Sequence, residues 1–583
     1  ARGAWYRRTI SLAAMEGRTA ASWNVVFEGD AFGRYAQFVD NVAIRHKDGT
    51  ATVIYGDGPP SARALLAANG YSQKPSLAMV PRPKVAETEA AVQSVIRTAE
   101  ALRALDEVRA DIEFARRFAE LEKSAAVRLQ VEAAAEAMRE IEAKGAPPPD
   151  QVAVVLAIAR AALAKVGPAL KSYTGHLVGH AHIDNPWLWE WQESIVAGRD
   201  TFTQAVKFMK EFPGFTFSQS SSALYAGIER DYPELFDQIK AMVLKGQWEI
   251  VGGRITEADL NMLSPESHAR QFLYGQSYFR EKFGKTAKVG WEPDTFGHTS
   301  QMPQILKLAG CDYYYFCRGG KDKPLFWWQG PDGSRVLAFD ETATGSWYNS
   351  DITPKVFDEM LQFREATGSK DMLWVYGVGN HGGGPTRENV QTAREWMKQP
   401  AKPTVKFSTA EAFFKGLEKY DLSKLPVVAE DLNTVFEGCY TSHAEIKRAN
   451  RDAEAWTTSA EATAAVAWLW GAPYPRADIR KNWEQIGLNQ FQDTLPGSTP
   501  HPASVRAATR LASVVARDRE IIGDALETLV QRVTPKQGGV SVLVFNPTGW
   551  KRSGWIEAYA VKSGWDGGPS VDLSRAVAEG PDG

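Results

Sequence analysis

The chain has 583 residues, of which 44% are hydrophobic and 23% charged, with a formal net charge of −3 and a pI near 6.4. This length predicts about three to five domains, because single hydrophobic cores stop growing at roughly 250–300 residues. The balanced charge excludes the basic surface that binds nucleic acid, and no apolar run approaches the ~20 residues that span a bilayer. Three cysteines cannot form a disulfide framework, which favours a cytoplasmic location.

The N-terminal part of the chain divides into two regions of different composition. Residues 1–84 contain short strand-like runs broken by Gly, Asp and Pro, such as SWNVVFEG, and predict a β-rich unit. Residues 85–170 are rich in Ala, Glu and Arg with apolar residues at helical spacing, and predict helices that cover a neighbouring domain. The chain begins at Ala without the apolar region of a signal peptide, so a processed or trimmed N-terminus stays open.

The remaining sequence predicts three further regions. In residues 171–440 short apolar strands such as GHLVGH, WEIVGG and AKVGWEPD alternate with amphipathic helices, which predicts an α/β domain built on a parallel sheet. Ligands gather at the carboxyl ends of the strands in such sheets. Residues 441–534 predict an antiparallel helical bundle, and the strand-like text in residues 535–583 predicts the start of a C-terminal β domain.

The stretch GHAHIDNPWLWEW follows the first strand of the α/β domain and brings His180, His182 and Asp184 close together in the sequence. Side chains at i and i+2 of an extended chain share a face, so His182 and Asp184 can both reach one ion. An imidazole and a carboxylate predict half of a site for Zn²⁺ or a related divalent metal. His180 is either a third ligand or a group that orients one. Trp187 and Trp189 are either platforms for sugar rings or packing residues.

Polar side chains also follow later strands. In GWEPDTFG, Asp294 lies at a strand end, where it suits nucleophilic or metal-ligand work or caps the next helix. In GQWEIVGGRITEADLN, Glu257 and Asp259 alternate after a strand, which suits the binding of sugar hydroxyls or belongs to a solvated loop. The loop GVGNHGGGPT lets the backbone approach a ligand closely, with His381 projecting from it, but lacks the ending of a phosphate-binding P-loop.

Taken in order, these motifs resemble those of the family 38 glycoside hydrolases, the class II α-mannosidases. GHAHIDNPWLWEW resembles the family's His-x-His-x-Asp-x-x-Trp signature and WEPDTFGHTSQMPQIL resembles its nucleophile segment. GQWEIVGGRITEADLN, GVGNHGGGPTRE, NQFQDTLPGS and VFNPTGW also have counterparts. The resemblance implies an α/β domain, a three-helix bundle and a C-terminal β-sandwich. Only the first strands of that sandwich are expected here, so we expect a truncated chain.

The resemblance also implies one divalent metal, usually zinc. Carried over by position, His182, Asp184 and Asp294 are metal ligands, and Asp294 is also the catalytic nucleophile. The family's fourth ligand is a histidine. His443 is the first candidate for this ligand, and His381 is the second.

Two departures from the family pattern accompany this assignment. The usual upstream positions of the fourth ligand hold Asn433 and Phe436, and Gln492 stands where a His-Asp pair is commoner.

The implied reaction is the hydrolysis of terminal α-mannosides of glycans or oligosaccharides by a retaining exo-α-mannosidase. The nucleophile attacks the anomeric carbon, and a second carboxyl protonates the leaving oxygen and then activates water. Asp351 is the candidate for this acid/base by a loose match, with Asp340 and Glu341 as alternatives. The candidate substrate-binding residues are Trp187, Glu257, Asp259 and His381.

Two other functions stay open from the residues alone. Metal-dependent amidohydrolases also place His-x-His after a first strand, and a non-catalytic sugar-binding protein would share the aromatic residues. The sequence predicts a carbohydrate partner, no nucleic-acid or membrane partner, and leaves homo-oligomerisation open.

Overall fold

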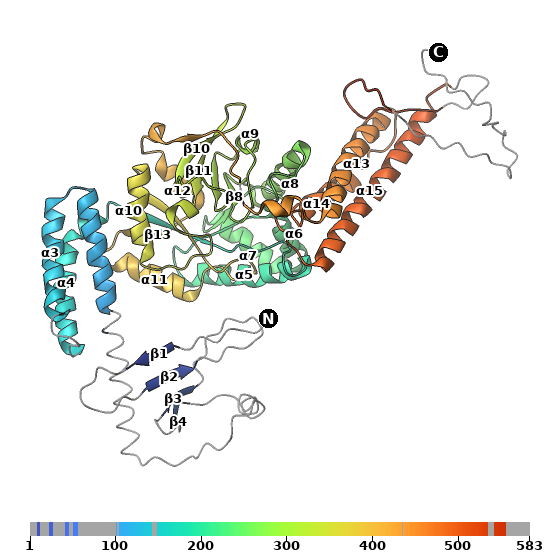
Figure 1. Ribbon diagram of the computed structural model, residues 1–583. Coiled ribbons are helices and arrows are strands. Elements are labelled where there is room, and N and C mark those ends of the chain that lie inside the picture. The colour runs from blue at the N-terminus through green and yellow to red at the C-terminus, as the bar shows by residue number, and fades with distance from the viewer. Residues whose placement is uncertain are drawn as a thin grey trace. The chain divides into compact units, whose positions relative to one another are not determined.

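A computed structural model describes four short strands within residues 8–55, residue 101, and residues 104–142, 149–433, 435–534 and 542–554 (Figure 1). The chain divides into two compact units, residues 1–169 and 170–583.

The first unit contains an antiparallel sheet and a set of helices. The sheet has the order β1-β2-β3-β4, with strands β1 (Arg8–Ser11), β2 (Ser22–Val26), β3 (Asn41–Arg45) and β4 (Ala51–Tyr55). A helix over residues 104–121 precedes α3 (Ala125–Glu142) and α4 (Pro149–Leu170). Residues Gln151–Leu170 of α4 are long and apolar enough to cross a membrane by length and composition, with a mean hydropathy of 1.7 in the best window. The core helix of a soluble protein passes the same test, so this helix alone is weak support for a membrane span.

The second unit opens with a fully parallel sheet. Its strands are β5 (Thr174–His180), β6 (Phe217–Gln219), β7 (Trp248–Ile250), β12 (Asp371–Tyr376) and β13 (Thr404–Phe407). The order is β12-β5-β6-β7, and β13 pairs with the first half of β5. The connecting helices include α5 (Trp191–Glu211), α6 (Ser222–Asp231), α7 (Pro233–Leu244), α8 (Pro265–Phe283), α11 (Arg387–Lys398) and α12 (Ala410–Leu417). The predicted α/β domain with parallel strands is therefore confirmed.

A second sheet has the order β14-β10-β11-β9-β8. Its strands are β8 (Val289–Glu292), β9 (Tyr313–Phe316), β10 (Leu325–Gln329), β11 (Arg335–Asp340) and β14 (Val427–Val428), and its helices are α9 (Met302–Leu308) and α10 (Lys355–Thr367). The pairing of β10 with β11 is antiparallel, because the Pro-Asp-Gly turn between them closes a hairpin, and β14 runs parallel to β10. The hydrogen bond from Gly252 N to Val289 O, 2.8 Å long, links the end of β7 to the start of β8.

Separate hydrophobic cores support the two sheets. Phe217 and Trp248 of the first sheet pack in one cluster with Phe202, Leu224 and Phe279 of the surrounding helices. The second cluster lies under the other sheet, and its members include Leu306, Tyr314, Phe326, Trp328 and Ala338. Each sheet is therefore held in place by its own hydrophobic core, and this fixes the loops at the carboxyl ends of the strands.

Three helices follow the α/β domain: α13 (Ala444–Leu469), α14 (Arg476–Asn489) and α15 (His501–Val530) (Figure 1). They share a core that includes Ala460, Trp483 and Leu511. The carboxylate of Asp518 on α15 accepts hydrogen bonds from Thr457 Oγ1 at 2.6 Å and Asn482 Nδ2 at 2.8 Å, so one buried group joins all three helices.

Short 3₁₀ turns occur at Thr342–Thr344, Leu422–Lys424 and Glu437–Tyr440. Residues 542–554, the described part of the predicted C-terminal strands, form no strand. Leu543 and Phe545 instead pack against the apolar cluster at the far end of α13 and α15. The rest of the predicted β segment lies outside the described residues.

Candidate active site

Three ligand-type side chains meet at the carboxyl ends of β5 and β8. His182 and Asp184 follow β5, and Asp294 follows β8. One potential ligand atom from each lies within 4.8 Å of the others, and all three residues are buried. We call His182, Asp184 and Asp294 the strand-end cluster. Segments more than a hundred residues apart in the sequence therefore supply one compact set of donors.

Glu257, which follows β7, holds the strand-end cluster together. Its Oε2 lies 3.0 Å from His182 Nε2, and its Oε1 accepts the backbone N–H of Asp294 at 2.6 Å and of Thr295 at 3.1 Å. Since Nε2 of His182 is directed at this carboxylate, the other ring nitrogen is left for a different partner. His182 Nδ1 and Asp184 Oδ1 are both buried without a hydrogen-bond partner among the described residues.

His180 is engaged by the protein at both ring nitrogens. Its Nδ1 lies 2.9 Å from the carbonyl oxygen of Ser218, and Trp291 Nε1 donates to its Nε2 at 3.2 Å. Burial lowers the pKa of His180 to about 3, so the ring is neutral. The sequence left His180 open as a ligand or an orienting group, and the geometry gives it the second role.

The carboxylate of Asp294 is held from two sides. Arg318 Nε donates to Oδ1 at 2.5 Å, and Gln492 Nε2 donates to Oδ2 at 3.0 Å. The guanidinium of Arg318 also lies over aromatic rings, 4.8 Å from the ring centre of Trp347 and 5.1 Å from that of Phe436. These contacts fix both the position and the charge environment of the carboxylate.

The electrostatics of the cluster suit a cation. Burial opposes the charged form of His182, but the negative charges of Glu257 and Asp184 outweigh it and raise the pKa of His182 to about 10. Burial raises the pKa of Asp294, and it raises that of Asp493 to about 7. Several carboxyl groups crowd around one imidazole, an arrangement that a divalent ion neutralises. His182 Nδ1 and Asp184 Oδ1 lie 3.5 Å apart and make no hydrogen bond among the described residues, so this donor set fits a metal.

An aromatic group borders the loop that carries Asp184. The rings of Trp187 and Trp189 lie 6.0 Å apart, and those of Trp189 and His381 lie 4.2 Å apart. His381 is exposed and its Nε2 lies 2.9 Å from Glu193 Oε1. Partly open aromatic faces of this kind suit the stacking of a sugar ring.

Other predicted site residues lie outside the strand-end cluster. His443 has 35% of its side chain exposed and its Nδ1 lies 3.1 Å from Glu445 Oε1. Asp351 is exposed and accepts a hydrogen bond from Asn389 Nδ2 at 3.2 Å. Asp259 is fully buried, and its Oδ1 accepts the backbone N–H groups of the two residues at 261 and 262.

Two side chains that contact Asp294 were not predicted as site residues. Arg318 lies two residues after the strand YYYF, which was a signal for a strand-end position, but a single Arg carries no recognisable spacing. Gln492 was noted only as a departure from a family pattern, and its contact with Asp294 spans 198 residues.

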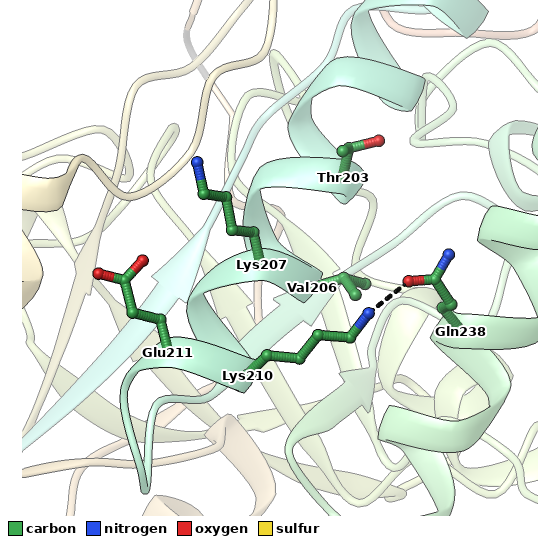
Figure 2. Close-up of a pocket in the computed structure, with 6 residues that line it drawn as sticks. All are labelled: Thr203, Val206, Lys207, Lys210, Glu211 and Gln238. Atoms are coloured by element: carbon green, nitrogen blue, oxygen red, sulfur yellow. Dashed lines mark hydrogen bonds between the residues drawn. The ribbon is translucent and has the colours of Figure 1, made fainter.

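A surface hollow lies between α5 and α7 (Figure 2). It is lined by Thr203, Val206, Lys207, Lys210, Glu211 and Gln238. Lys210 Nζ donates to Gln238 Oε1 at 2.6 Å across it. None of its lining residues belongs to the strand-end cluster.

Two sequence models match the chain in succession. The N-terminal domain of the glycosyl hydrolases family 38 matches residues 172–435, and the alpha mannosidase middle domain matches residues 434–529. Together they cover more than half of the chain. The chain belongs to glycoside hydrolase family 38.

Curated members of family 38 resemble the chain over part of their length. It is 29% identical over 390 residues to Alpha-mannosidase 2C1 of Homo sapiens and 33% identical over 329 residues to Alpha-mannosidase G of Dictyostelium discoideum. These matches cover 65% and 55% of this chain but only 37% and 30% of the two relatives. The chain thus spans about a third of the length of these relatives.

A solved structure shares the fold. The alpha-mannosidase from Enterococcus faecalis V583 matches with a TM-score of 0.56 at 19% identity, over 62% of this chain and 43% of that chain.

Two of the three residues that were expected to depart from the family 38 pattern lie beside Asp294 or its partner Arg318. Phe436 adopts a left-handed backbone conformation with φ of 55° and places its ring beside Arg318. Gln492 contacts Asp294 directly. Asn433 Oδ1 accepts from Asn261 Nδ2 at 3.0 Å in the neighbouring loop.

Proposed function

We propose that the chain is a metal-dependent retaining exo-α-mannosidase that hydrolyses terminal α-mannosides of glycans or oligosaccharides. The observation that carries the proposal is the convergence of His182, Asp184 and Asp294 at strand ends in a family 38 chain. The relatives named alpha-mannosidases support the substrate class.

His182, Asp184 and Asp294 are the residues that would hold the ion. When bound, a divalent cation supplies a Lewis-acid contact to neighbouring hydroxyls of a mannose-like ring. Glu257 acts on this set as a positioning residue, because it bonds His182 and the backbone of Asp294 rather than facing open space.

Asp294 is the proposed nucleophile. Its carboxylate oxygen forms a bond to the anomeric carbon while the bond from that carbon to the leaving oxygen breaks. Of the three cluster residues Asp294 is the most accessible, with 8% of its surface exposed against 3% for His182 and 1% for Asp184. Arg318 keeps a positive charge beside it, which opposes the effect of burial on its pKa.

A second carboxyl must protonate the leaving oxygen and later take a proton from the water that attacks the glycosyl-enzyme. We keep Asp351 as the proposed acid/base, since it is exposed and follows Trp347 and Tyr348, which border the cluster. The alternatives Asp340 and Glu341 are 1% and 0% exposed, which favours the exposed Asp351 over both.

Asp493 is the rival for this role, because its charge interacts with those of Asp294 and His182. Azide rescue separates the two. Removing the true acid/base slows release of poor leaving groups, and added azide restores turnover as a glycosyl azide of retained configuration. We expect azide to restore turnover in Asp351→Asn. If azide restores turnover in Asp493→Asn alone, Asp493 is the acid/base instead of Asp351.

The substrate ring is proposed to stack on the aromatic group that includes Trp187 and His381. Asp259 and Glu257 were predicted to bind hydroxyls, but their carboxylates are directed at internal N–H groups. We therefore assign both a positioning role. A cytoplasmic location is proposed from the three free cysteines, two of which, Cys311 and Cys317, are buried.

The test is hydrolysis of an aryl α-mannoside with and without chelator, with an aryl amide assayed in parallel. We expect chelator-sensitive release of α-mannose, its configuration read by proton NMR at early times, and no amide cleavage. Asp294→Asn should remove turnover and keep sugar binding. Cleavage of the amide alone would favour an amidohydrolase, and sugar binding without turnover in the unmodified chain would favour a non-catalytic binding protein.

A further inference from the structure

Gln492 occupies a distinctive place beside the strand-end cluster. It follows α14, it is 0% exposed, and its backbone N–H donates to Glu257 O at 3.0 Å. Its side-chain Nε2 donates to Asp294 Oδ2 at 3.0 Å. Both ends of the residue are thus bound to groups that build the cluster, which leaves the amide little freedom to move away from it.

The amide oxygen of Gln492 has no partner. Oε1 is buried without a hydrogen bond among the described residues, as are His182 Nδ1 and Asp184 Oδ1. Since His182 Nε2 faces the Glu257 carboxylate, Nδ1 presents a lone pair when the ring is neutral. Gln492 Oε1 and Asp184 Oδ1 therefore lack a hydrogen bond among the described residues, and buried polar atoms are rarely left so. His182 Nδ1 lies 3.5 Å from Asp184 Oδ1, and a cation that displaces the proton on Nδ1 would find a third donor there.

The geometry of the amide also suits coordination. Rotation of the amide by 180° exchanges Nε2 and Oε1. The hydrogen bond from Nε2 to Asp294 is then lost, and the oxygen takes the position 3.0 Å from Asp294 Oδ2, where a cation bound to both oxygens replaces that bond. Neighbouring oxygens around a divalent ion with ligand distances near 2.1 Å lie about 3.0 Å apart. Gln492 and Asp294 are therefore spaced as adjacent ligands of one ion.

We propose that Gln492 supplies the fourth protein donor of the cation site through Oε1, beside His182, Asp184 and Asp294. This inference rests on the proposed function, because it assumes that the cluster binds a divalent cation. The resulting set has one imidazole nitrogen and three oxygens. Oxygen donors suit Mn²⁺, whereas a second imidazole suits Zn²⁺. The site therefore discriminates less strongly in favour of Zn²⁺ over Mn²⁺ than a site with a second histidine.

The test is direct titration of the full chain with Mn²⁺ alone and with Zn²⁺ alone, with Kd read by calorimetry. In Gln492→Met, which keeps the side-chain length and removes the oxygen, we expect Mn²⁺ affinity to fall at least tenfold. In Gln492→His we expect the ratio of Zn²⁺ to Mn²⁺ affinity to rise at least tenfold. Pulsed EPR of bound Mn²⁺ should detect one directly bound imidazole nitrogen in the unmodified chain and two in Gln492→His.

The matched control is Gln490→Met. Gln490 is a buried glutamine two residues earlier whose Nε2 donates to Ser267 and Asn450. Its replacement by Met should therefore disturb the packing to a similar extent without removing a side chain that contacts the strand-end cluster. Its Mn²⁺ affinity should equal that of the unmodified chain. Equal Mn²⁺ affinity in Gln492→Met, or loss of Mn²⁺ in His443→Ala instead, would overturn the assignment of Gln492.

Mannoside hydrolysis measured on the same preparations distinguishes a failure of the Gln492 assignment from a failure of the proposed metal-dependent function. A chain that binds Mn²⁺ and hydrolyses the mannoside, but is insensitive to Gln492→Met, overturns only the fourth donor. A chain that binds neither Mn²⁺ nor Zn²⁺ overturns the fourth donor and the metal dependence together.

Discussion

Replacing Glu257 by Gln tests how the cluster is held in shape. Glu257 accepts hydrogen bonds from His182 and from the backbone of Asp294 and Thr295 through two oxygens. The amide keeps only one acceptor oxygen. If that oxygen stays on the two backbone N–H groups, the amide NH₂ faces His182 Nε2, where two donors oppose each other. His182 then shifts its proton to Nδ1, the atom proposed to bind the ion.

The expected loss follows from the role of groups that orient metal ligands. Removing such a partner lowers metal affinity about 10- to 100-fold, or about 1.4–2.7 kcal/mol. The assay is titration of the purified chain with Mn²⁺ by calorimetry, alongside a thermal melt without metal. We expect Kd in Glu257→Gln to rise by that factor while the melt stays cooperative.

Glu249→Gln is the matched control. Glu249 on β7 likewise accepts two backbone N–H groups, from Ala410 at 2.7 Å and Glu411 at 2.8 Å, together with the Ser218 hydroxyl at 2.5 Å. It should lose a similar amount of stability with no change in cation affinity. Equal Kd values for Glu257→Gln and the unmodified chain would refute the reasoning, since Glu257 would then not orient His182.

Three further predictions concern the nucleophile, pH and the helices. Replacing Arg318 by Met removes the positive charge paired with Asp294, and kcat on an aryl α-mannoside should fall about 100-fold. Arg318→Lys keeps the charge and should show a smaller fall. An unchanged kcat in Arg318→Met would exclude a role of this charge in catalysis. Burial lowers the pKa of His298 to about 3, below its unfolded value of about 6.5, so the stability that His298 contributes is lost as the pH falls below 6.5. Between pH 7.5 and 5.5 the unmodified chain should lose about 1.4 kcal/mol more than His298→Gln in urea unfolding, and parallel pH profiles would contradict this. Asp518→Ala breaks the buried hydrogen bonds that join α13, α14 and α15, and should cost about 2–3 kcal/mol, read as a lower thermal midpoint.

Local sequence patterns predicted the strand-end positions well. Apolar runs followed by polar residues placed His182, Asp184 and Asp294 at the carboxyl ends of β5 and β8, because strand ends and their first loop residues are governed by short-range signals. The side-chain period of an extended segment was a weaker guide. His180 shares a face with His182 in an extended segment, yet its ring turns to Ser218 and Trp291.

Contacts between distant segments could not be predicted in this way. The proximity of Gln492 to Asp294 depends on how the segment after α14 pairs with the loop that carries Glu257. Two backbone hydrogen bonds make this pairing, from Gln492 N to Glu257 O and from Asp259 N to Gln490 O, and no local pattern encodes them. His443 was predicted as a ligand from its residue type alone, and its ring instead meets Glu445 two residues along the chain. Residue type and spacing identify candidates, whereas topology decides which of them meet.

The most direct test of the metal site is anomalous scattering from a crystal of the chain loaded with Mn²⁺ or Zn²⁺, with data collected on both sides of the metal's absorption edge. The account predicts one strong anomalous peak bounded by the side chains of His182, Asp184 and Asp294. A crystal in which these three side chains surround no peak, or in which the ion binds only elsewhere, would contradict it.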